Sequence, residues 1–174
     1  MNFEYNDERF NMTPKVWHKH TGFTAIEMMV VVVILGILAA IAIPSSLGRI
    51  IKEQVVVALP LADIAKTPIA ASWTATKTLL VDNKEAGLPA PDNIVSNFVS
   101  AVEVQNGAIH MTFGNKANAQ IKGKILSFRP AVIEASQIVP VAWVCGNAKV
   151  PDKMTLKGEN KTNIPEGYLP YLCR

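Results

Sequence analysis

The feature that most limits how this chain can fold is a run of 21 residues, Met28 to Gly48, without a charged side chain. As an α-helix this run would be about 31 Å long, close to the thickness of the hydrocarbon core of a bilayer. A secretory signal peptide has a shorter apolar core and ends at a small-residue cleavage site, whereas this run ends in Pro44-Ser45-Ser46. A small domain also rarely surrounds a helix that is apolar on every face. We therefore predict a membrane-spanning helix.

The charges before this run predict its orientation. The preceding segment carries Lys15 and Lys19 and has no acidic residue between Glu8 and Glu27. Positive flanks stay on the cytoplasmic side, so we expect the N-terminus in the cytoplasm and the C-terminal part across the membrane. Met12 is an alternative start, which would shorten the segment before the helix.

The rest of the composition argues against most classes of enzyme. Of three histidines only His110 lies in the body of the chain, with no acidic residue or cysteine at ligand spacing, so we interpret it as structural. The two cysteines lack partners for a zinc site. We find no catalytic or phosphate-binding motif, and predict no enzyme, metal or cofactor. The formal charge of +3 does not indicate the concentrated basic surface that DNA binding requires.

Apolar residues continue past Arg49 at helical spacing. They recur every three or four residues, which predicts one apolar face of an amphipathic helix over residues 49–81. Pro60 and Pro68 should kink or break this helix, because proline has no N–H to donate. The members of this stripe are Leu47, Ile51, Val55, Ala58, Ala62, Ala65, Ile69 and Trp73.

Residues 82–174 change to a two-residue period, which predicts an antiparallel sheet. Asn106-Gly107 lies between two alternating segments and indicates a hairpin with a type I′ turn. Further strands are predicted over residues 124–128, with a possible extension to Ile133, and over residues 139–145. Alternate residues of the last strand, from Val139 to Cys145, should face the N-terminal helix.

The segment from Gly22 to Glu27, with the sequence Gly-Phe-Thr-Ala-Ile-Glu, resembles the processing site of type IV prepilins and related filament subunits. The apolar sequence that follows, with Gly36 and Pro44, is similar to the N-terminal helix of that family. The resemblance is specific over residues 22–48 and general to about residue 80. Beyond that point it rests on architecture and cysteine placement.

The resemblance implies that residues 1–22 are a leader. A membrane aspartic peptidase would cut between Gly22 and Phe23 on the cytoplasmic face, and the new Phe23 amine would be N-methylated. Glu27 would act in subunit assembly. A carboxylate at the edge of an apolar helix costs about 2–3 kcal/mol to insert, and pairing with the Phe23 amine of a neighbouring subunit would compensate that cost.

Gly36, Pro44 and Gly48 have two interpretations. They are ordinary residues of membrane helices, which contain more glycine and proline than soluble helices do. Alternatively, they make the backbone compliant, so that the helix kinks or unwinds locally in a filament.

Cys145 and Cys173 form either one disulfide or two free thiols. A bond would close a 29-residue loop and contribute about 3–4 kcal/mol. The predicted topology places both residues in an oxidising compartment. Type IV pilins carry a similar C-terminal disulfide loop, so the resemblance favours the bonded pair.

Together these features imply an α+β protein with a type IV pilin fold. Residues 23–48 would form the transmembrane and filament-core helix. Residues 49–81 would form an amphipathic helix that packs on the antiparallel sheet of residues 82–174, whose tail is closed by the disulfide.

The implied function is structural. The subunit would polymerise with identical or related subunits into surface filaments used in adhesion, motility or DNA uptake. Its other partners would be the prepilin peptidase and the inner-membrane assembly machinery, with weaker support for DNA or a host surface. The precursor would lie in the inner membrane and the mature protein in an extracellular pilus. The alternatives are a type II secretion pseudopilin, a minor DNA-binding pilin, and a membrane-anchored domain that is not cut after Gly22.

Overall fold

The computed structural model describes residues 22–174, except for the side chains of residues 42–46. Most of the expected leader, including Lys15 and Lys19, lies outside the described residues. The chain divides into two compact units, Met1–Ala40 and Ile41–Arg174. The long helix α1 (Ala25–Ala58) contributes residues to both units.

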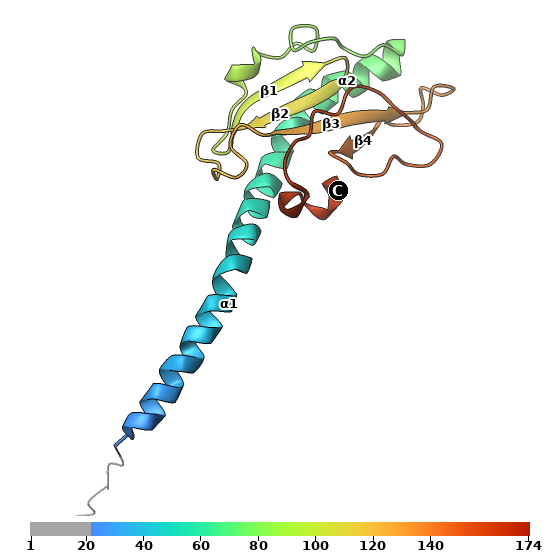
Figure 1. Ribbon diagram of the computed structural model, residues 1–174. Helices are drawn as coiled ribbons and strands as arrows, with labels where there is room; N and C mark the ends of the chain where they lie inside the picture. The colour runs from blue at the N-terminus through green and yellow to red at the C-terminus, as the bar shows by residue number, and fades with distance from the viewer. Residues whose placement is uncertain (1–21) are drawn as a thin grey trace, which may run out of the picture. The chain divides into compact units, whose positions relative to one another are not determined.

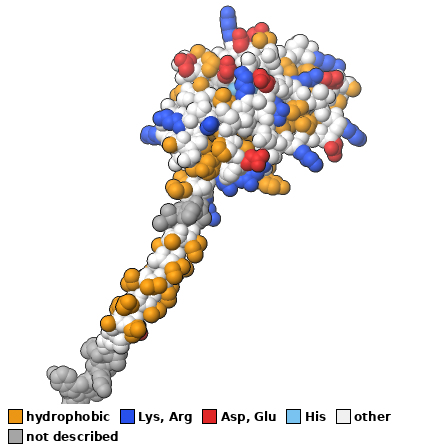
Figure 2. Space-filling model, in the orientation of Figure 1, with side chains coloured by type: hydrophobic (Ala, Val, Ile, Leu, Met, Phe, Trp, Pro, Cys, Tyr) orange, Lys and Arg blue, Asp and Glu red, His pale blue; other side chains and the backbone are white. Residues whose placement is uncertain are grey.

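In the first unit, α1 has no buried side chain among the described residues. Every side chain from Ala25 to Ala40 is exposed, and most of them are large and apolar. Apolar side chains cover the visible face of this helical stretch (Figure 2). The helix therefore presents to its surroundings a surface that water solvates poorly.

In the second unit, one face of the helices is buried in the core. The helical path continues from α1 through a 3₁₀ turn, η1 (Leu59–Ala62), into α2 (Asp63–Thr76). The apolar stripe predicted from the spacing is the buried face, except that its first member, Leu47, is exposed. The buried members are Ile51, Val55, Ala58, Ala62, Ala65, Ile69 and Trp73.

The two prolines affect this path differently. At Pro60 the helix tightens into η1, whereas α2 continues through Pro68. Helix α2 ends at Thr76, short of the expected boundary at residue 81. It stops there because Lys77 adopts a left-handed conformation, with φ of 59°, and its N–H donates to the carbonyl of Trp73.

An antiparallel sheet completes the core, as the two-residue period predicted. Four strands lie side by side with α2 behind them (Figure 1). They are β1 (Val99–Gln105), β2 (Ala108–Phe113), β3 (Ile125–Val132) and β4 (Ala142–Cys145), and the short β5 (Thr155–Leu156) also pairs with β3. Besides η1, the described part of the chain has three more 3₁₀ turns: η2 (Pro91–Asn93), η3 (Glu166–Tyr168) and η4 (Tyr171–Cys173).

The hairpin between β1 and β2 has the predicted turn. Gln105 pairs with Ala108, which leaves Asn106 and Gly107 as a two-residue connection. Their φ angles are 48° and 81°, and positive values at both positions are required by a type I′ turn. The Asn-Gly pair in the sequence therefore fixes the register of this hairpin.

Strand β4 is shorter than predicted. It begins at Ala142 rather than Val139, and Pro140 explains the difference because it has no N–H for the ladder. Trp143 and Cys145 still lie on the core side of the sheet, as the alternation predicted. Val139 and Val141 are only partly buried and lie outside the strand.

The outer face of the sheet is covered by a segment of the tail, residues 157–163, which we call the strap. Its backbone and side chains bond to β3: the Lys161 N–H donates to Ser127 Oγ at 2.9 Å, and the Ser127 N–H donates to Thr162 Oγ1 at 3.0 Å. Gly158 lies so close to the sheet that a Cβ there would be 2.7 Å from the Cβ of Ala108. The strap therefore buries the centre of the outer face.

Asn83, in the loop after α2, pairs with the free edge of the sheet. Its Nδ2 donates to the carbonyls of Val102 and Pro89, at 2.9 and 3.0 Å, and its Oδ1 accepts from the Val104 N–H at 2.6 Å. The side chain amide therefore takes the place of a neighbouring strand at the β1 edge. Asn83 itself is only 6% exposed, so water does not replace these bonds.

We expect Asn83→Ala to lower the free energy of unfolding by about 2–4 kcal/mol, because it leaves buried backbone groups of β1 without partners. Urea unfolding of the full-length protein in detergent, followed by near-UV circular dichroism, measures this change. Asn93→Ala is the matched control, since Asn93 is exposed and its loss should change the value by no more than about 0.5 kcal/mol. Equal effects of the two substitutions would contradict the edge role.

Candidate functional site

The bond predicted to be cut lies just before the first turn of α1. Phe23 is 71% exposed, and no neighbouring atom lies within 4 Å of the position of a Cβ on Gly22. Within the described part of the chain, nothing covers the Gly22–Phe23 peptide bond. The geometry is therefore compatible with access by a peptidase.

Glu27 has a local role that sequence reasoning missed. The Thr24 N–H donates to Glu27 Oε2 at 3.4 Å, and the Glu27 N–H donates to Thr24 Oγ1 at 3.3 Å. This reciprocal pair is a capping box, which satisfies free N–H groups at a helix start. The signal in the sequence was a threonine followed three residues later by glutamate.

The capping box does not neutralise Glu27. Thr24 brings hydrogen bonds but no positive charge, and Glu27 is the only charged residue from Gly22 to Gly48. An ionised carboxylate has lone pairs for about four hydrogen bonds, so it retains acceptor capacity for another donor. The site therefore combines a partly satisfied carboxylate with an apolar, exposed helix.

Two helical stretches in the described part of the chain are apolar enough to be compared as candidates for membrane insertion. Leu47–Thr76 is long and apolar enough to cross a membrane by length and composition, but its apolar stripe is buried in the core of the second unit. Ala25–Ile41 is shorter, and all of its side chains are exposed. Burial distinguishes them, because only Ala25–Ile41 leaves its whole apolar surface for another environment.

The three positions predicted to make the helix compliant all lie in α1. No neighbouring atom would contact a Cβ added at Gly36 or Gly48, so no close approach within the described chain requires glycine there. Pro44 falls among the residues whose side chains are not described. The helix backbone is continuous through these positions, and compliance remains a prediction about the assembled state.

Cys145 and Cys173 form the expected disulfide. It links the end of β4 to the turn η4 near the end of the chain, and both residues are buried. The Asn147 N–H also donates to the Cys173 carbonyl at 3.0 Å. The tail is therefore attached to the sheet at the strap and again at this bond.

His110 is buried beneath the strap, between neighbouring strands of the sheet. It pairs with Glu103 and Ser127 across the neighbouring strands, and its Nδ1 is 2.9 Å from Ser127 Oγ. Its Nε2 is buried without a hydrogen-bond partner in the described structure. Among residues 22–174, no three His, Cys, Asp or Glu side chains gather as candidate metal ligands.

The surroundings of His110 favour its neutral form. Burial, and then the positive charge of Lys161, lower the pKa of His110, while Glu103 and Glu159 oppose that shift. A proton on His110 would therefore place a charge under the strap, next to the backbone segment that Lys161 attaches to Ser127.

Comparisons with known proteins agree with these features. Residues 52–174 match the pattern of a family described as Pilin (bacterial filament), and residues 17–43 match the Prokaryotic N-terminal methylation motif. The chain is 34% identical to the "Type IV major pilin protein PilE" of Neisseria gonorrhoeae, over 88% of this chain and 93% of the relative. It is 33% identical to "Fimbrial protein Q" of Moraxella bovis, over 88% of this chain and 96% of the relative. Fimbrial protein EcpC of Eikenella corrodens is 30% identical, over 88% of this chain and 90% of the relative.

The lowered pKa of His110 predicts that the fold loses stability in acid. Because the folded state disfavours the proton, the unfolded chain binds more protons once the pH falls below its ordinary histidine pKa of about 6.5. The contribution of neutral His110 to the free energy of unfolding is therefore complete above that pH. Below it, the free energy of unfolding falls by at most about 1.4 kcal/mol per pH unit. Urea unfolding of the full-length protein in detergent between pH 8 and pH 5 measures it.

The matched variant is His110→Asn, which keeps a polar group near Ser127 and cannot titrate. Protonation of carboxylates affects both proteins, so the difference between them isolates His110. We expect the wild type to lose more stability than the variant below about pH 6.5. Parallel curves for the two proteins would show that His110 does not carry the effect.

Proposed function

The chain belongs to the type IV pilin family, and from this membership we propose that it is inserted in the inner membrane, cut after Gly22 and polymerised through α1. Membership makes it a structural subunit of a pilus. The proposal adds the sequence of events and the residues that act in it. Adhesion, twitching motility and DNA uptake are the uses we propose for the resulting surface filament.

The observation that supports this proposal most is the exposed apolar surface of α1 from Ala25 to Ala40. Each large apolar side chain left in water forgoes about 1.5–3 kcal/mol of burial free energy. A bilayer removes this surface from water, and so does a bundle of the same helices from neighbouring subunits. Because both environments are apolar, the helix moves from one to the other without re-exposure to water.

Glu27 then becomes the group that decides how subunits pack. The capping box with Thr24 provides hydrogen bonds, but a carboxylate in an apolar environment still lacks an opposite charge. Cleavage after Gly22 creates a positive amine at Phe23. A neighbouring subunit shifted along the filament axis brings its amine to Glu27, and registers that leave the carboxylate unpaired are disfavoured.

The other features of the chain have roles that fit this arrangement. Lys15 and Lys19 keep the N-terminus in the cytoplasm, where the peptidase acts, and the second unit crosses to the oxidising side. The Cys145–Cys173 bond is consistent with that location. In the filament, Gly36, Pro44 and Gly48 allow α1 to bend or unwind locally while the helices pack. The sheet, the strap and the tail form the outer surface.

We expect Glu27→Gln to abolish filaments, because glutamine retains the capping box but cannot pair with an amine as a charge. Glu27→Ala removes both interactions and should have the same effect. Thr24→Val removes the capping hydroxyl, keeps the carboxylate, and should retain filaments within about twofold. The measurement is the amount of subunit in the sheared surface fraction, where loss of one buried charge partner predicts a decrease of at least about tenfold.

Each variant must first be shown to reach the membrane and to begin at Phe23, so that a failure of processing is not counted as a failure of assembly. Normal filaments from Glu27→Gln would show that Glu27 acts only as a helix cap. Loss of filaments from Thr24→Val as complete as that from Glu27→Gln would assign the assembly defect to the capping box instead of the charge.

A further inference from the structure

The second unit is basic where α1 enters it. The uncharged run of the helix ends at Gly48, and Arg49 and Lys52 follow within one helical turn. Glu53 is the only acidic residue between Arg49 and Pro60. This first group of cations therefore lies on α1, directly after the stretch that is expected to lie in an apolar environment.

A second group of cations lies on the loop between β2 and β3. Residues 114–124 contain three lysines and no acidic residue, and Lys116 and Lys122 are exposed. The loop is attached to α1 near the first group, because the Asn118 N–H donates to Gln54 Oε1 at 2.9 Å. Two separate elements therefore bring cations to the same part of the second unit.

The fold holds this loop in place. Its base is closed by two hydrogen bonds of 2.8 Å, from the Gly123 N–H to the Phe113 carbonyl and from the Phe113 N–H to the Lys124 carbonyl. Ile121, within the loop, is fully buried. The lysines therefore project from a fixed backbone, and little backbone entropy is lost when they bind a partner.

A third group lies at the tail turn η4 and combines apolar side chains with a cation. Tyr171 is 90% exposed and Leu172 is 74% exposed, although the disulfide-bonded Cys173 next to them is buried. Lys149 lines the same shallow hollow as Tyr171 and Leu172. Arg174 also lines it, but the α-carboxylate of this last residue of the sequence offsets its charge. The turn therefore presents two apolar side chains beside a positive charge.

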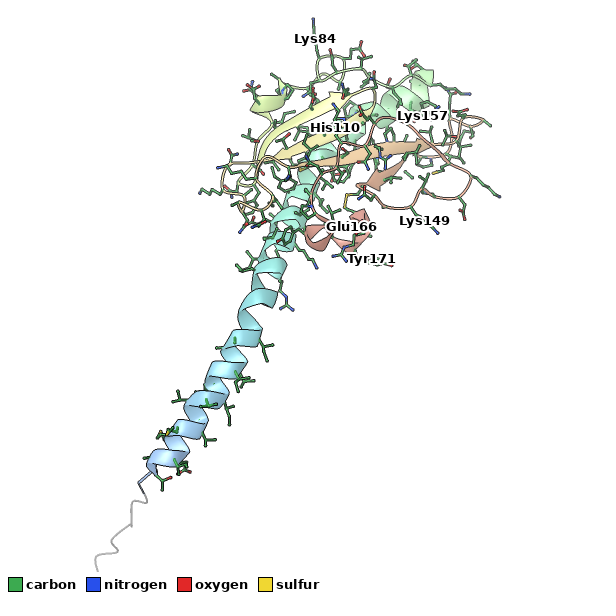
Figure 3. The ribbon with its side chains drawn as sticks, viewed as in Figure 1. Lys84, His110, Lys149, Lys157, Glu166 and Tyr171 are labelled. Atoms are coloured by element: carbon green, nitrogen blue, oxygen red, sulfur yellow. A yellow bond between two sulfur atoms is a disulfide. The ribbon has the colours of Figure 1, made fainter. Side chains whose placement is uncertain are left out.

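The three groups lie at one end of the second unit. In Figure 1, the loop between β2 and β3 and the dark red tail turn η4 both lie at the end where α1 enters, and in Figure 3 Tyr171 is near this end. Lys and Arg side chains are visible there in the space-filling view (Figure 2). We call the three groups together the basic collar: Arg49 and Lys52, the lysines of residues 114–124, and Lys149 with Tyr171 and Leu172.

The opposite end of the unit has a different charge. Residues 82–92 carry three acidic residues against one lysine, Lys84, which marks that end in Figure 3. At the collar, only Glu53 and Glu166 oppose the six cations. Neither of the two ion pairs in the described part of the chain uses a collar cation. The positive end of the unit therefore retains its charge for an anionic partner.

An anionic membrane surface is the partner that fits this arrangement. Arg49 is the first charged residue after a run long enough to span the hydrocarbon core, so membrane insertion places it at the level of the lipid headgroups. Basic residues next to a membrane-spanning helix are attracted to anionic lipids. Tyrosine, with an apolar ring and a polar hydroxyl, is typical of the membrane–water interface. A nucleic acid would also attract the lysines, but it gives no role to the exposed Leu172.

We propose that the basic collar docks on the anionic headgroups of the bilayer in which α1 is inserted. Arg49 and the lysines contact lipid phosphates, Tyr171 and Leu172 enter the headgroup region, and the acidic end of the unit points away from the membrane. This inference rests on the proposed function, because it requires insertion of α1. It adds a contact that holds the second unit against the membrane before the subunit enters a filament.

The most direct test replaces Tyr171 with the photo-crosslinking residue p-benzoylphenylalanine in the full-length chain, in nanodiscs of phosphatidylcholine with or without phosphatidylglycerol. We expect covalent lipid adducts, detected by mass, that are at least about fivefold more abundant with the anionic lipid, as the attraction of even one basic residue to an anionic surface implies. The same residue at Lys84, on the opposite end, is the matched control and should give only background. Absence of adducts at position 171, or equal yields in the two lipids, would overturn the inference.

A charge variant tests the collar independently. Lys122→Gln removes one collar cation and should lower the yield of lipid adducts from position 171 about two- to fivefold in nanodiscs that contain phosphatidylglycerol. Lys84→Gln removes an exposed lysine from the opposite end, is the control, and should leave the yield unchanged. Equal decreases in the two variants would show a dependence on net charge alone and would contradict a role for the collar.

The remaining outcomes separate this inference from its rival and from the proposed function. Binding of short double-stranded DNA that Lys122→Gln abolishes, without lipid adducts at position 171, would assign the collar to nucleic acid and overturn the lipid contact. If the chain does not enter nanodiscs, the proposed insertion fails and the inference fails with it. If the chain enters them but position 171 gives no adducts, only the collar contact is wrong.

Discussion

The structure depends on where the apolar surface of the long N-terminal helix is buried and where it is exposed. From Ile51 onward one stripe of the helices is buried against the sheet, and this single face organises the core of the second unit. From Met28 to Ala40 the helix is apolar on all sides, and every one of these side chains is exposed. The first arrangement is complete within one chain, whereas the second requires a bilayer or other subunits. The requirement for such an environment connects the fold of this pilin to its assembly.

Much of the fold was predictable because each element has a local signal. The spacing of the stripe from Ile51 to Trp73 predicted the buried helix face, and Asn106-Gly107 predicted the hairpin turn. The boundaries were less predictable, since they depend on single residues. The left-handed conformation of Lys77 ends α2, and Pro140 delays the start of β4, although Val139 continues the alternating pattern.

The site was predictable where it follows from a motif and not where it depends on contacts between distant residues. The motif around Gly22 and Glu27 could be identified from the sequence. The capping role of Thr24 was overlooked, although Thr24 and Glu27 have the three-residue spacing of a capping box. The loop after α2 is held by Asn83, whose side chain bonds to a strand about twenty residues away, and the strap depends on contacts between Lys161 and Ser127. No local pattern encodes these pairings, because they are decided by which backbone groups the folded sheet leaves free.

The central claim is that this chain is cut after Gly22 and that the cut form is the filament subunit. The most direct test is the intact mass and N-terminal sequence of the protein from sheared surface filaments and from membranes of the same cells. The account predicts a chain that begins at N-methylated Phe23 in the filaments. A chain that begins at Met1 or Met12 in both fractions would contradict it and leave only a membrane-anchored domain. A methylated chain confined to the membranes would contradict the surface filament and favour a pseudopilin.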